Sequence, residues 1–208
     1  MSRPLTLLVA SLKGGVGKTS TAVTLAHIAQ TTGDGPAVLL DLDEHLGAVE
    51  WAEQAAGEGV PLPFSVVDAS RTDLASSFDR LTDGAAVVLI DSAPGRRALD
   101  AAAKVADAAL VMFRPNRGDL SRLPETMDRL ESAGVPTLVG LSQVRLGTLS
   151  TKAARQALDL DDLPLVVEVP LREQIADSFG TVPDAVTHFY LSAYLELIGL
   201  ARAGVATP

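Results

Sequence analysis

The sequence contains no cysteine. This excludes disulfide bonds, thiolate metal sites, iron–sulfur clusters and cysteine nucleophiles. Histidine is also scarce, because only His27, His45 and His188 are present and they are scattered along the chain. Isolated histidines of this kind are more typical of surface or helix positions than of a metal centre.

Long hydrophobic runs are missing as well. The longest uninterrupted apolar runs, such as residues 108–113, are far too short to cross a bilayer. The N-terminus, MSRPLTLLVASLKGG, lacks the long apolar core and the cleavage site of a signal peptide. We therefore expect a cytoplasmic protein without a membrane interaction. With 208 residues, 47% of them hydrophobic, the chain suits a single domain over residues 1–208 with a substantial core.

Positive charge is in short supply, with 17 lysines and arginines against 26 acidic residues and a net charge of −9. A protein coated in basic surface for nucleic acid is therefore disfavoured. A local basic patch remains compatible with this balance.

Short apolar runs alternate with longer helical patterns along the whole chain. The expected strands are residues 5–10, 37–40, 64–67, 86–90, 110–113, 137–141 and 165–167. The expected helices are residues 18–31, 47–57, 71–82, 97–105, 120–133 and 151–158, with a last long helix over 184–203. Most of the strands are apolar throughout, as when helices cover both faces of a parallel sheet. The pattern predicts a three-layer α/β fold, a mostly parallel twisted sheet flanked by helices.

The ends of three expected strands carry the polar residues of interest. In such a sheet, ligands bind beyond the carboxyl ends of the strands. The first strand ends in SLKGGVGKTS (residues 11–20), the second in Asp41-Leu42-Asp43, and the fourth in Asp91-Ser92-Ala93-Pro94-Gly95. A glycine-lysine loop facing two acidic strand ends predicts a phosphate and magnesium site.

The glycine-rich loop is suited to phosphate because its backbone N–H groups form an anion nest at a helix N-terminus. Lys18 places a compact charge on the terminal phosphates, the Thr19 hydroxyl is a ligand for Mg²⁺, and Ser20 is within reach of the α-phosphate. The residues expected around the nucleotide are Lys13, Gly14, Gly15, Val16, Gly17, Lys18, Thr19 and Ser20. These residues predict a site for nucleotide phosphates and Mg²⁺.

The loop departs from the general G-x-x-x-x-G-K-[ST] pattern, since Leu12 stands where the first glycine belongs and Lys13 is an additional lysine. The segment K-G-G-V-G-K-T resembles the deviant Walker A motif of the ParA/MinD family of dimerising ATPases. The resemblance implies that Lys13 crosses a dimer interface to the ATP of the partner subunit, while Lys18 serves the subunit's own nucleotide. It thus implies a homodimer held together by ATP.

The acidic strand ends resemble the other motifs of that family. Asp91 resembles the Walker B aspartate that holds Mg²⁺ through water, and residues 92–95 resemble part of switch II. Asp41 and Asp43 match the D-x-D of switch I, which implies that Asp43 orients the attacking water and Asp41 supports the Mg²⁺ shell. The resemblance thus implies Mg²⁺-dependent hydrolysis of ATP to ADP and phosphate, with Lys13, Lys18 and Asp43 as catalytic residues.

The sequence departs from the family directly after Asp43, where Glu44-His45 replaces the usual Pro-Gln. Weaker resemblances continue along the chain. Gln143, with Ser142, lies where the family has an asparagine near adenine, and Pro170 belongs to a segment whose backbone lines the base. We expect Asp119 to cap a helix and Trp51 to be a packing residue.

Absences select within the family. Members with iron–sulfur clusters need cysteines, tyrosine kinases of this fold carry a tyrosine-rich tail, and MinD-type proteins end in a basic membrane helix. None of these features is present, and the first strand begins too early for an N-terminal helix-turn-helix. The resemblance therefore implies a small ParA-type partition ATPase, nucleoid-associated when ATP-bound, that segregates plasmid or chromosome DNA. A centromere-binding or cargo-adaptor protein would stimulate it.

Such a protein binds non-specific DNA, which requires clustered basic residues. The candidates for DNA contacts are Arg145, Lys152, Arg155 and Arg172. An alternative is a nucleotide-gated switch that recruits a protein partner and positions a non-DNA cargo with little hydrolysis, which the Glu44-His45 departure motivates. A metabolic enzyme of the same fold, such as a biotin-pathway ligase, is a third alternative, against which the additional Lys13 argues.

Overall fold

The computed structural model describes residues 3–205 and contains one seven-stranded sheet with the order β3-β2-β4-β1-β5-β6-β7. Every neighbouring pair of strands is parallel. The strands are β1 (Leu5–Ala10), β2 (Ala37–Asp41), β3 (Ser65–Asp68), β4 (Val87–Asp91), β5 (Ala108–Phe113), β6 (Thr137–Val144) and β7 (Leu165–Pro170). The predicted parallel sheet is thereby confirmed.

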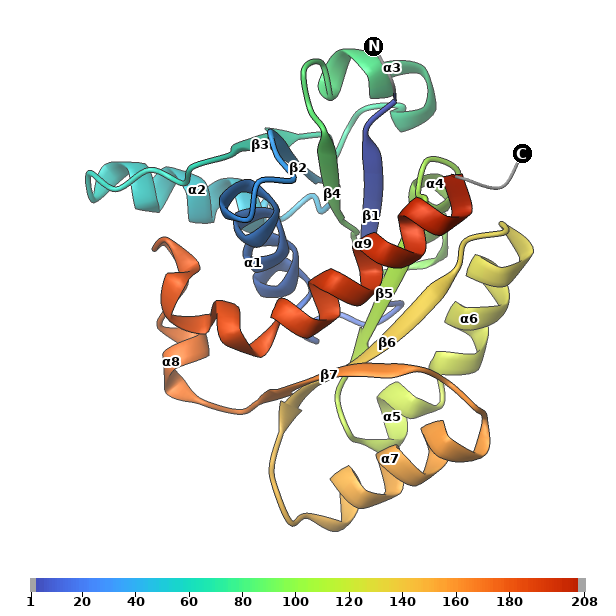
Figure 1. Cartoon of the computed structure of the whole chain (residues 1–208). Helices are drawn as coiled ribbons and strands as arrows, with labels where there is room; N and C mark the ends of the chain where they lie inside the picture. The colour runs from blue at the N-terminus through green and yellow to red at the C-terminus, as the bar shows by residue number, and fades with distance from the viewer. Residues whose placement is uncertain (1–2, 206–208) are drawn as a thin grey trace.

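Helices cover both faces of this sheet (Figure 1). One layer contains α1 (Lys18–Thr31), α2 (Gly47–Gly57), α8 (Glu173–Ala176), the 3₁₀ helix η1 (Pro183–Phe189) and α9 (Leu191–Val205). The other contains α3 (Leu74–Leu81), α4 (Arg96–Ala103), α5 (Arg117–Leu120), α6 (Leu123–Ser132) and α7 (Leu149–Leu160). The three-layer architecture follows from strands that are apolar on both faces.

The strand β1 illustrates this two-sided burial. Leu7 and Val9 pack into the core beneath α1, whereas Leu8 and Ala10 pack into the core on the opposite face. All four side chains are fully buried. Because alternate residues of a strand point to opposite faces, an uninterrupted apolar run supplies both cores at once.

Two expected helices differ from the structure in their bounds. The helix predicted over 120–133 corresponds to α6, but its first residue, Leu120, belongs to α5, so the predicted range touches two elements. Pro124 occupies the first turn of α6. Proline is tolerated in a first turn but not in a helix interior, which explains why this helix begins at Leu123 rather than at residue 120. The predicted helix is confirmed with a later start.

The last long helix, predicted over 184–203, is also two elements. The 3₁₀ helix η1 ends at Phe189, and α9 starts at Leu191. Between them Tyr190 is fully buried and its hydroxyl hydrogen-bonds with Thr21 of α1. This tertiary contact places the interruption, and no periodicity in the sequence signals it. The short helix α8 was not predicted.

The strand order determines which loops meet. Because β1 lies between β4 and β5, and β4 pairs with β2 on its other side, the carboxyl ends of β1, β2 and β4 are neighbours. Asp91 is the register partner of Val9 on one side and of Asp41 on the other. The fold thus assembles the three motif-bearing strand ends at one edge of the sheet.

Part of the predicted single domain and of the C-terminal tail, residues 1–2 and 206–208, lies outside the described residues. Within residues 3–205, no helix has the length and apolar character needed to span a bilayer.

Candidate functional site

The loop after β1 is shaped by two left-handed glycines. Gly15 has φ 69° and Gly17 has φ 82°, a region that L side chains rarely adopt. Between them, Val16 is fully buried in the core and anchors the loop. The loop leads directly into α1, which has no side-chain cap and no acidic residue in its first turn. The first N–H groups of α1 therefore remain available to an anion.

Lys18 lies at the start of α1 and is only 6% exposed. Its Nζ donates a hydrogen bond to the main-chain oxygen of Lys13 at 3.1 Å. Burial lowers the pKa of the Lys18 ammonium, and the nearby carboxylates of Asp91 and Asp43 partly offset this effect. The structure thus brings together a buried cation and the two acidic residues predicted from the strand ends.

Thr19 and Asp91 are joined by the shortest contact of the site. The Thr19 hydroxyl donates to Asp91 Oδ2 at 2.6 Å. Burial, together with the charges of Asp41 and Asp43, raises the pKa of Asp91 to about 7 against the opposing effects of Thr19 and Lys18. The other oxygen, Oδ1, is buried without a hydrogen-bond partner in the described part of the chain. A buried carboxylate oxygen left unpaired in this way is costly.

This unpaired oxygen fits a magnesium ion. Mg²⁺ prefers oxygen ligands, keeps several waters and is usually bound by one or two protein groups together with substrate phosphates. The Thr19 hydroxyl and the Asp91 carboxylate supply this sparse donor set beside the phosphate loop. Within residues 3–205 no group of three or more histidine, aspartate or glutamate residues could hold a metal alone. The site therefore matches a metal that arrives with a nucleotide.

Asp41 is fully buried, and its carboxylate accepts hydrogen bonds from main-chain N–H groups. Its Oδ1 accepts from the N–H of Asp43 at 3.0 Å, and its Oδ2 accepts from Ala48 at 2.9 Å and Val49 at 3.2 Å. Burial raises the pKa of Asp41, with the three N–H donors acting in the opposite direction. Asp41 therefore caps α2 from the end of β2, a structural role that the sequence did not predict.

Asp43 is half-buried and its Oδ1 accepts from the N–H of His45 at 3.1 Å. Its charge acts on Lys18, so the two side chains share one electrostatic environment. Glu44 and His45, the residues that depart from the family pattern, are exposed. The first turn of α2 begins close by, since a Cβ placed on Gly47 would lie 3.5 Å from Thr19 Cγ2.

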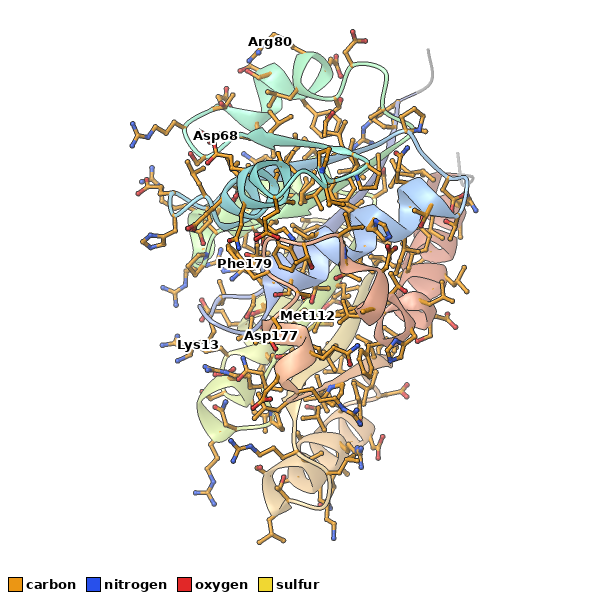
Figure 2. All side chains as sticks on the ribbon, turned by 90° about the vertical axis from the view of Figure 1, so that its left-hand side faces the viewer. Lys13, Asp68, Arg80, Met112, Asp177 and Phe179 are labelled. Atoms are coloured by element: carbon orange, nitrogen blue, oxygen red, sulfur yellow. The ribbon has the colours of Figure 1, made fainter. Side chains whose placement is uncertain are left out.

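Lys13 is half-buried and lies at the edge of the molecule in Figure 2. It lines a pocket of about 460 Å³ at the start of α4. The other residues that line this pocket are Leu12, Gly95, Arg96, Arg97, Arg122 and Glu125. The three arginines here were not predicted, although Arg96 and Arg97 directly follow the switch II segment and could have been noticed for that reason.

The residues predicted near the base are at the ends of β6 and β7. Gln143, in a left-handed conformation with φ 52°, donates from Nε2 to the main-chain oxygen of Gly15 at 2.9 Å. Ser142 is buried and donates to the main-chain oxygen of Phe113 at 3.4 Å. Pro170 ends β7 opposite Val144. Gln143 is thereby brought to the phosphate loop.

Asp119 is not the helix cap that we predicted. The cap of α5 is Asn116, whose Oδ1 accepts from the N–H of Asp119. Asp119 is buried inside this helix and holds the Arg114 guanidinium through contacts of 2.9 and 3.2 Å. Burial would raise the pKa of Asp119, but the hydrogen bonds from Arg114 outweigh it and hold the pKa below its usual value.

Arg114 is a candidate site residue that sequence reasoning missed. A Cβ placed on Gly15 would lie 4.0 Å from Arg114 Nη1, so the guanidinium flanks the phosphate loop. Its position after β5 results from Asp119, which also accepts the Arg114 N–H. The sequence signal was the pairing of an arginine with an aspartate five residues later at a strand end.

The four residues proposed for DNA contacts do not share one environment. Arg155 is engaged in a two-point ion pair with Glu168 of β7, which compensates its charge. Arg145, Lys152 and Arg172 are exposed. Arg145 and Arg172 are brought near each other, because the N–H of Leu171 donates to the main-chain oxygen of Val144.

Trp51 is fully buried and is a packing residue, as predicted. Its Nε1 donates to the main-chain oxygen of Thr181 at 2.8 Å, and its ring lies 5.1 Å from that of Phe179. The tryptophan thereby joins α2 to the loop between α8 and η1.

Comparison with known proteins gives one curated relative and many similar structures. No protein-family model matches the chain. The maintenance of carboxysome distribution protein A of Gloeobacter kilaueensis is 34% identical over 130 residues, which are 62% of this chain and 57% of the relative. The chain therefore matches little more than half the length of that relative.

Two solved structures show the same architecture. A plasmid partition protein of Borrelia burgdorferi bound to AMPPNP has a TM-score of 0.78 at 14% identity, over 97% of this chain and 99% of that chain. Apo McdA from Cyanothece has a TM-score of 0.74 at 18% identity, over 96% of this chain and 100% of that chain. The predicted P-loop fold is thereby confirmed.

Proposed function

We propose that this chain, which has the fold of the ParA/MinD-type ATPases and resembles that family in its phosphate loop, is a dimerising ATPase that positions a cargo. The observation that carries the proposal is the unpaired Asp91 oxygen beside Thr19 and the phosphate loop. A metal bound there would neutralise charge on a nucleotide that Lys18 and the α1 N-terminus hold. In support, one similar structure contains AMPPNP.

In the proposed reaction ATP and water give ADP and phosphate. Asp43, close to Lys18, orients the attacking water, and Lys18 holds the terminal phosphates. Asp41 keeps the start of α2 against the site through its hydrogen bonds to Ala48 and Val49. Catalysis here consists of positioning and charge neutralisation, since phosphoryl transfer needs little covalent chemistry from the protein.

The arrangement of the two loop lysines supports the dimer. Lys18 is buried in its own site, whereas Lys13 lies at the edge of the molecule. A lysine in that position is suited to the phosphates of a second subunit. Measuring the mass in solution by light scattering with ATP, with ADP and without nucleotide tests this. We expect an ATP-dependent dimer that Lys13→Ala abolishes while nucleotide binding is largely retained; normal dimerisation of Lys13→Ala would contradict the proposal.

Turnover of ATP with Mg²⁺ tests the enzyme itself. We expect slow phosphate release that Asp43→Ala abolishes. Loss of turnover with intact nucleotide binding is the result that assigns the water-positioning role to Asp43. Equal turnover in wild type and Asp43→Ala would contradict it.

Non-specific DNA is the surface on which we propose that the ATP dimer moves, with Arg145, Lys152 and Arg172 as contacts. Binding to random duplex at stated low salt, with ATP and with ADP, tests this. Arg145→Ala with Lys152→Ala should weaken binding and flatten its salt dependence, because each lost phosphate contact lowers the slope by about one unit. Arg155→Ala is a single-charge control, because its guanidinium already pairs with Glu168.

A second candidate is a nucleotide-gated switch that positions a cargo other than DNA with little hydrolysis. Two observations favour it: the curated relative is a carboxysome distribution protein, and Glu44-His45 replaces the usual Pro-Gln. Restoring Glu44→Pro with His45→Gln distinguishes the candidates. A large increase in turnover would support the slow switch, whereas a measurable wild-type turnover that the two substitutions leave unchanged would support the ATPase cycle. A cargo-adaptor or centromere-binding protein is the partner proposed in either case.

A further inference from the structure

A large groove lies on the molecule away from the phosphate loop, between α6 and α7. Its volume is about 960 Å³. Both helices cover the same face of the sheet, with their buried leucines in one core (Figure 1). The apolar residues that line the groove are Leu120, Leu123, Pro124, Met127, Val135, Pro136, Ala157, Leu158 and Leu163. A groove of this volume and apolar character fits the side chains of one amphipathic helix.

The rim of the groove is acidic. Asp128 and Glu131 of α6 and Asp161 after α7 line it, and all three are exposed. None of the three forms an ion pair with any residue of 3–205, and no lysine or arginine lines the groove. Such unpaired carboxylates around an apolar floor set up a negative potential over the surface.

The charge of the rim decides between occupants. A two-fold contact between two copies of this chain would bring the same carboxylates together, which is unfavourable. Nucleic acid is repelled for the same reason. A helix with apolar residues on one side and lysines or arginines beside them satisfies both the floor and the rim.

The helix α6 also contacts the nucleotide side of the fold. Its Glu125 pairs with Arg96 at the start of α4, and its Arg129 pairs with Asp100 of α4 at 2.8 Å. α4 directly follows Asp91 and the residues of the switch II segment. The outer face of α6 thus forms the groove while its other side is joined to the element that follows the metal-binding strand.

We propose that the groove between α6 and α7 is a docking surface for a basic amphipathic helix of a partner protein. The proposal rests on the proposed function in one respect: we take the protein that carries this helix to be the regulator of the ATPase. The surface itself needs no nucleotide, because every residue that forms it lies outside the phosphate site.

The test uses a labelled helical peptide of about 18 residues, with leucines at helix spacing i, i+3, i+4 and i+7 and lysines at the remaining positions. A counterpart carries glutamate for lysine. Fluorescence anisotropy at low salt measures binding to the full chain without nucleotide. The rim variant combines Asp128→Lys, Glu131→Lys and Asp161→Lys. The control variant combines Glu53→Lys, Asp83→Lys and Glu196→Lys, three exposed acids elsewhere with the same change of net charge.

We expect the basic peptide to bind wild type and the control variant alike, and the rim variant at least about tenfold more weakly, as for the loss of several charge contacts. Met127→Glu, which puts a charge on the half-buried floor, should also weaken binding. Equal binding to rim and control variants, binding of the acidic counterpart, or no binding to wild type would overturn the proposal. Because the assay contains no ATP, failure of the ATPase proposal leaves its outcome unchanged.

Discussion

The carboxyl ends of β1, β2 and β4 differ from those of β6 and β7 in how their residues are held. At the first group, Lys18, Asp41 and Asp91 are buried and tied by hydrogen bonds to neighbouring segments. At the second, Gln143 and Arg145 are exposed, and the pairing of β6 with β7 contains register shifts. One end is a rigid charged site, whereas the other is a surface.

The difference in burial between the two groups of strand ends determines how strongly a substitution should affect each of them. Buried charges must be paired or neutralised, so a change at Lys18 or Asp91 alters the whole site. Exposed residues of β6 and β7 are surrounded by water, which screens and replaces their contacts. We therefore expect large effects at the first end and small ones at the second.

The largest effect is expected for Lys18→Ala. Removing the buried charge that we propose contacts phosphate should cost about 4 kcal/mol, or about 1,000-fold in ATP affinity. Isothermal titration measures the affinity, and thermal unfolding of the same sample shows that the fold is intact. ATP affinity within tenfold of wild type would place the nucleotide elsewhere and break the comparison.

The second effect is the pH dependence of Mg²⁺ binding. The pKa of Asp91 is raised to about 7, and the carboxyl must lose its proton before it binds metal. Mg²⁺ affinity should therefore fall about tenfold for each pH unit below 7 and become independent of pH above about 7. Mg²⁺ titrations of the ADP-loaded protein between pH 5.5 and 8.5 measure this. Asp91→Asn is the control. In this variant the pH dependence of Mg²⁺ affinity that comes from ADP remains, whereas the part that comes from the Asp91 carboxyl is lost.

The raised pKa of Asp91 affects folding stability in the opposite direction from Mg²⁺ binding. Between about pH 4 and pH 7 the folded chain binds the proton more tightly than the unfolded chain does, so metal-free stability should decline as the pH rises through this interval. Urea unfolding at several pH values tests it. A stability that rises over this range in wild type relative to Asp91→Asn would contradict the raised pKa.

A smaller effect on stability is expected for Trp51→Phe. Trp51 connects α2, which follows β2, to the loop after α8, which follows β7. The variant loses the 2.8 Å hydrogen bond to Thr181 and part of a fully buried ring. We expect the free energy of unfolding to fall by about 2 kcal/mol. Urea denaturation followed by circular dichroism measures this, because Trp51 is the only tryptophan. A loss of ATP affinity without a loss of stability would instead indicate ligand contact.

The smallest effect is expected for Gln143→Ala. It removes one exposed hydrogen bond to Gly15, which is worth about 1 kcal/mol or less, so ATP affinity should fall about fivefold at most. Competition binding with ATP measures it. A fall beyond about tenfold would show that Gln143 contacts the nucleotide directly and would remove the contrast between the two ends.

Sequence reasoning succeeds where local chemistry requires particular residues. β1 and α1 have the predicted bounds, because a continuous apolar run and a glycine-lysine loop leave few alternatives. Asp91 and Asp43 approach Lys18 as expected from their strand ends. These features depend on residues within a few positions of each motif and on the rule that parallel strands end at one edge.

It fails where a role depends on the direction in which the fold points a side chain. The break at Tyr190 depends on a contact with the distant helix α1. The capping of α2 by Asp41 and the placement of Arg114 by Asp119 span only seven and five residues, but they depend on the course of the loop between the partners. Pro124 was a local signal that was overlooked, since proline favours a helix start. The residues proposed for DNA contacts are the weakest part, because exposure and pairing, as for Arg155 with Glu168, are properties of the fold.

The hydrogen bond from Lys18 Nζ to the main-chain oxygen of Lys13 has a consequence for the phosphate loop. The ammonium donates one of its three protons to its own loop, which leaves two donors for an arriving phosphate. The main chain at Lys13 is therefore tied to the buried site before any nucleotide binds. The lysine that we propose holds the phosphates thus also positions the start of the loop that carries the second lysine.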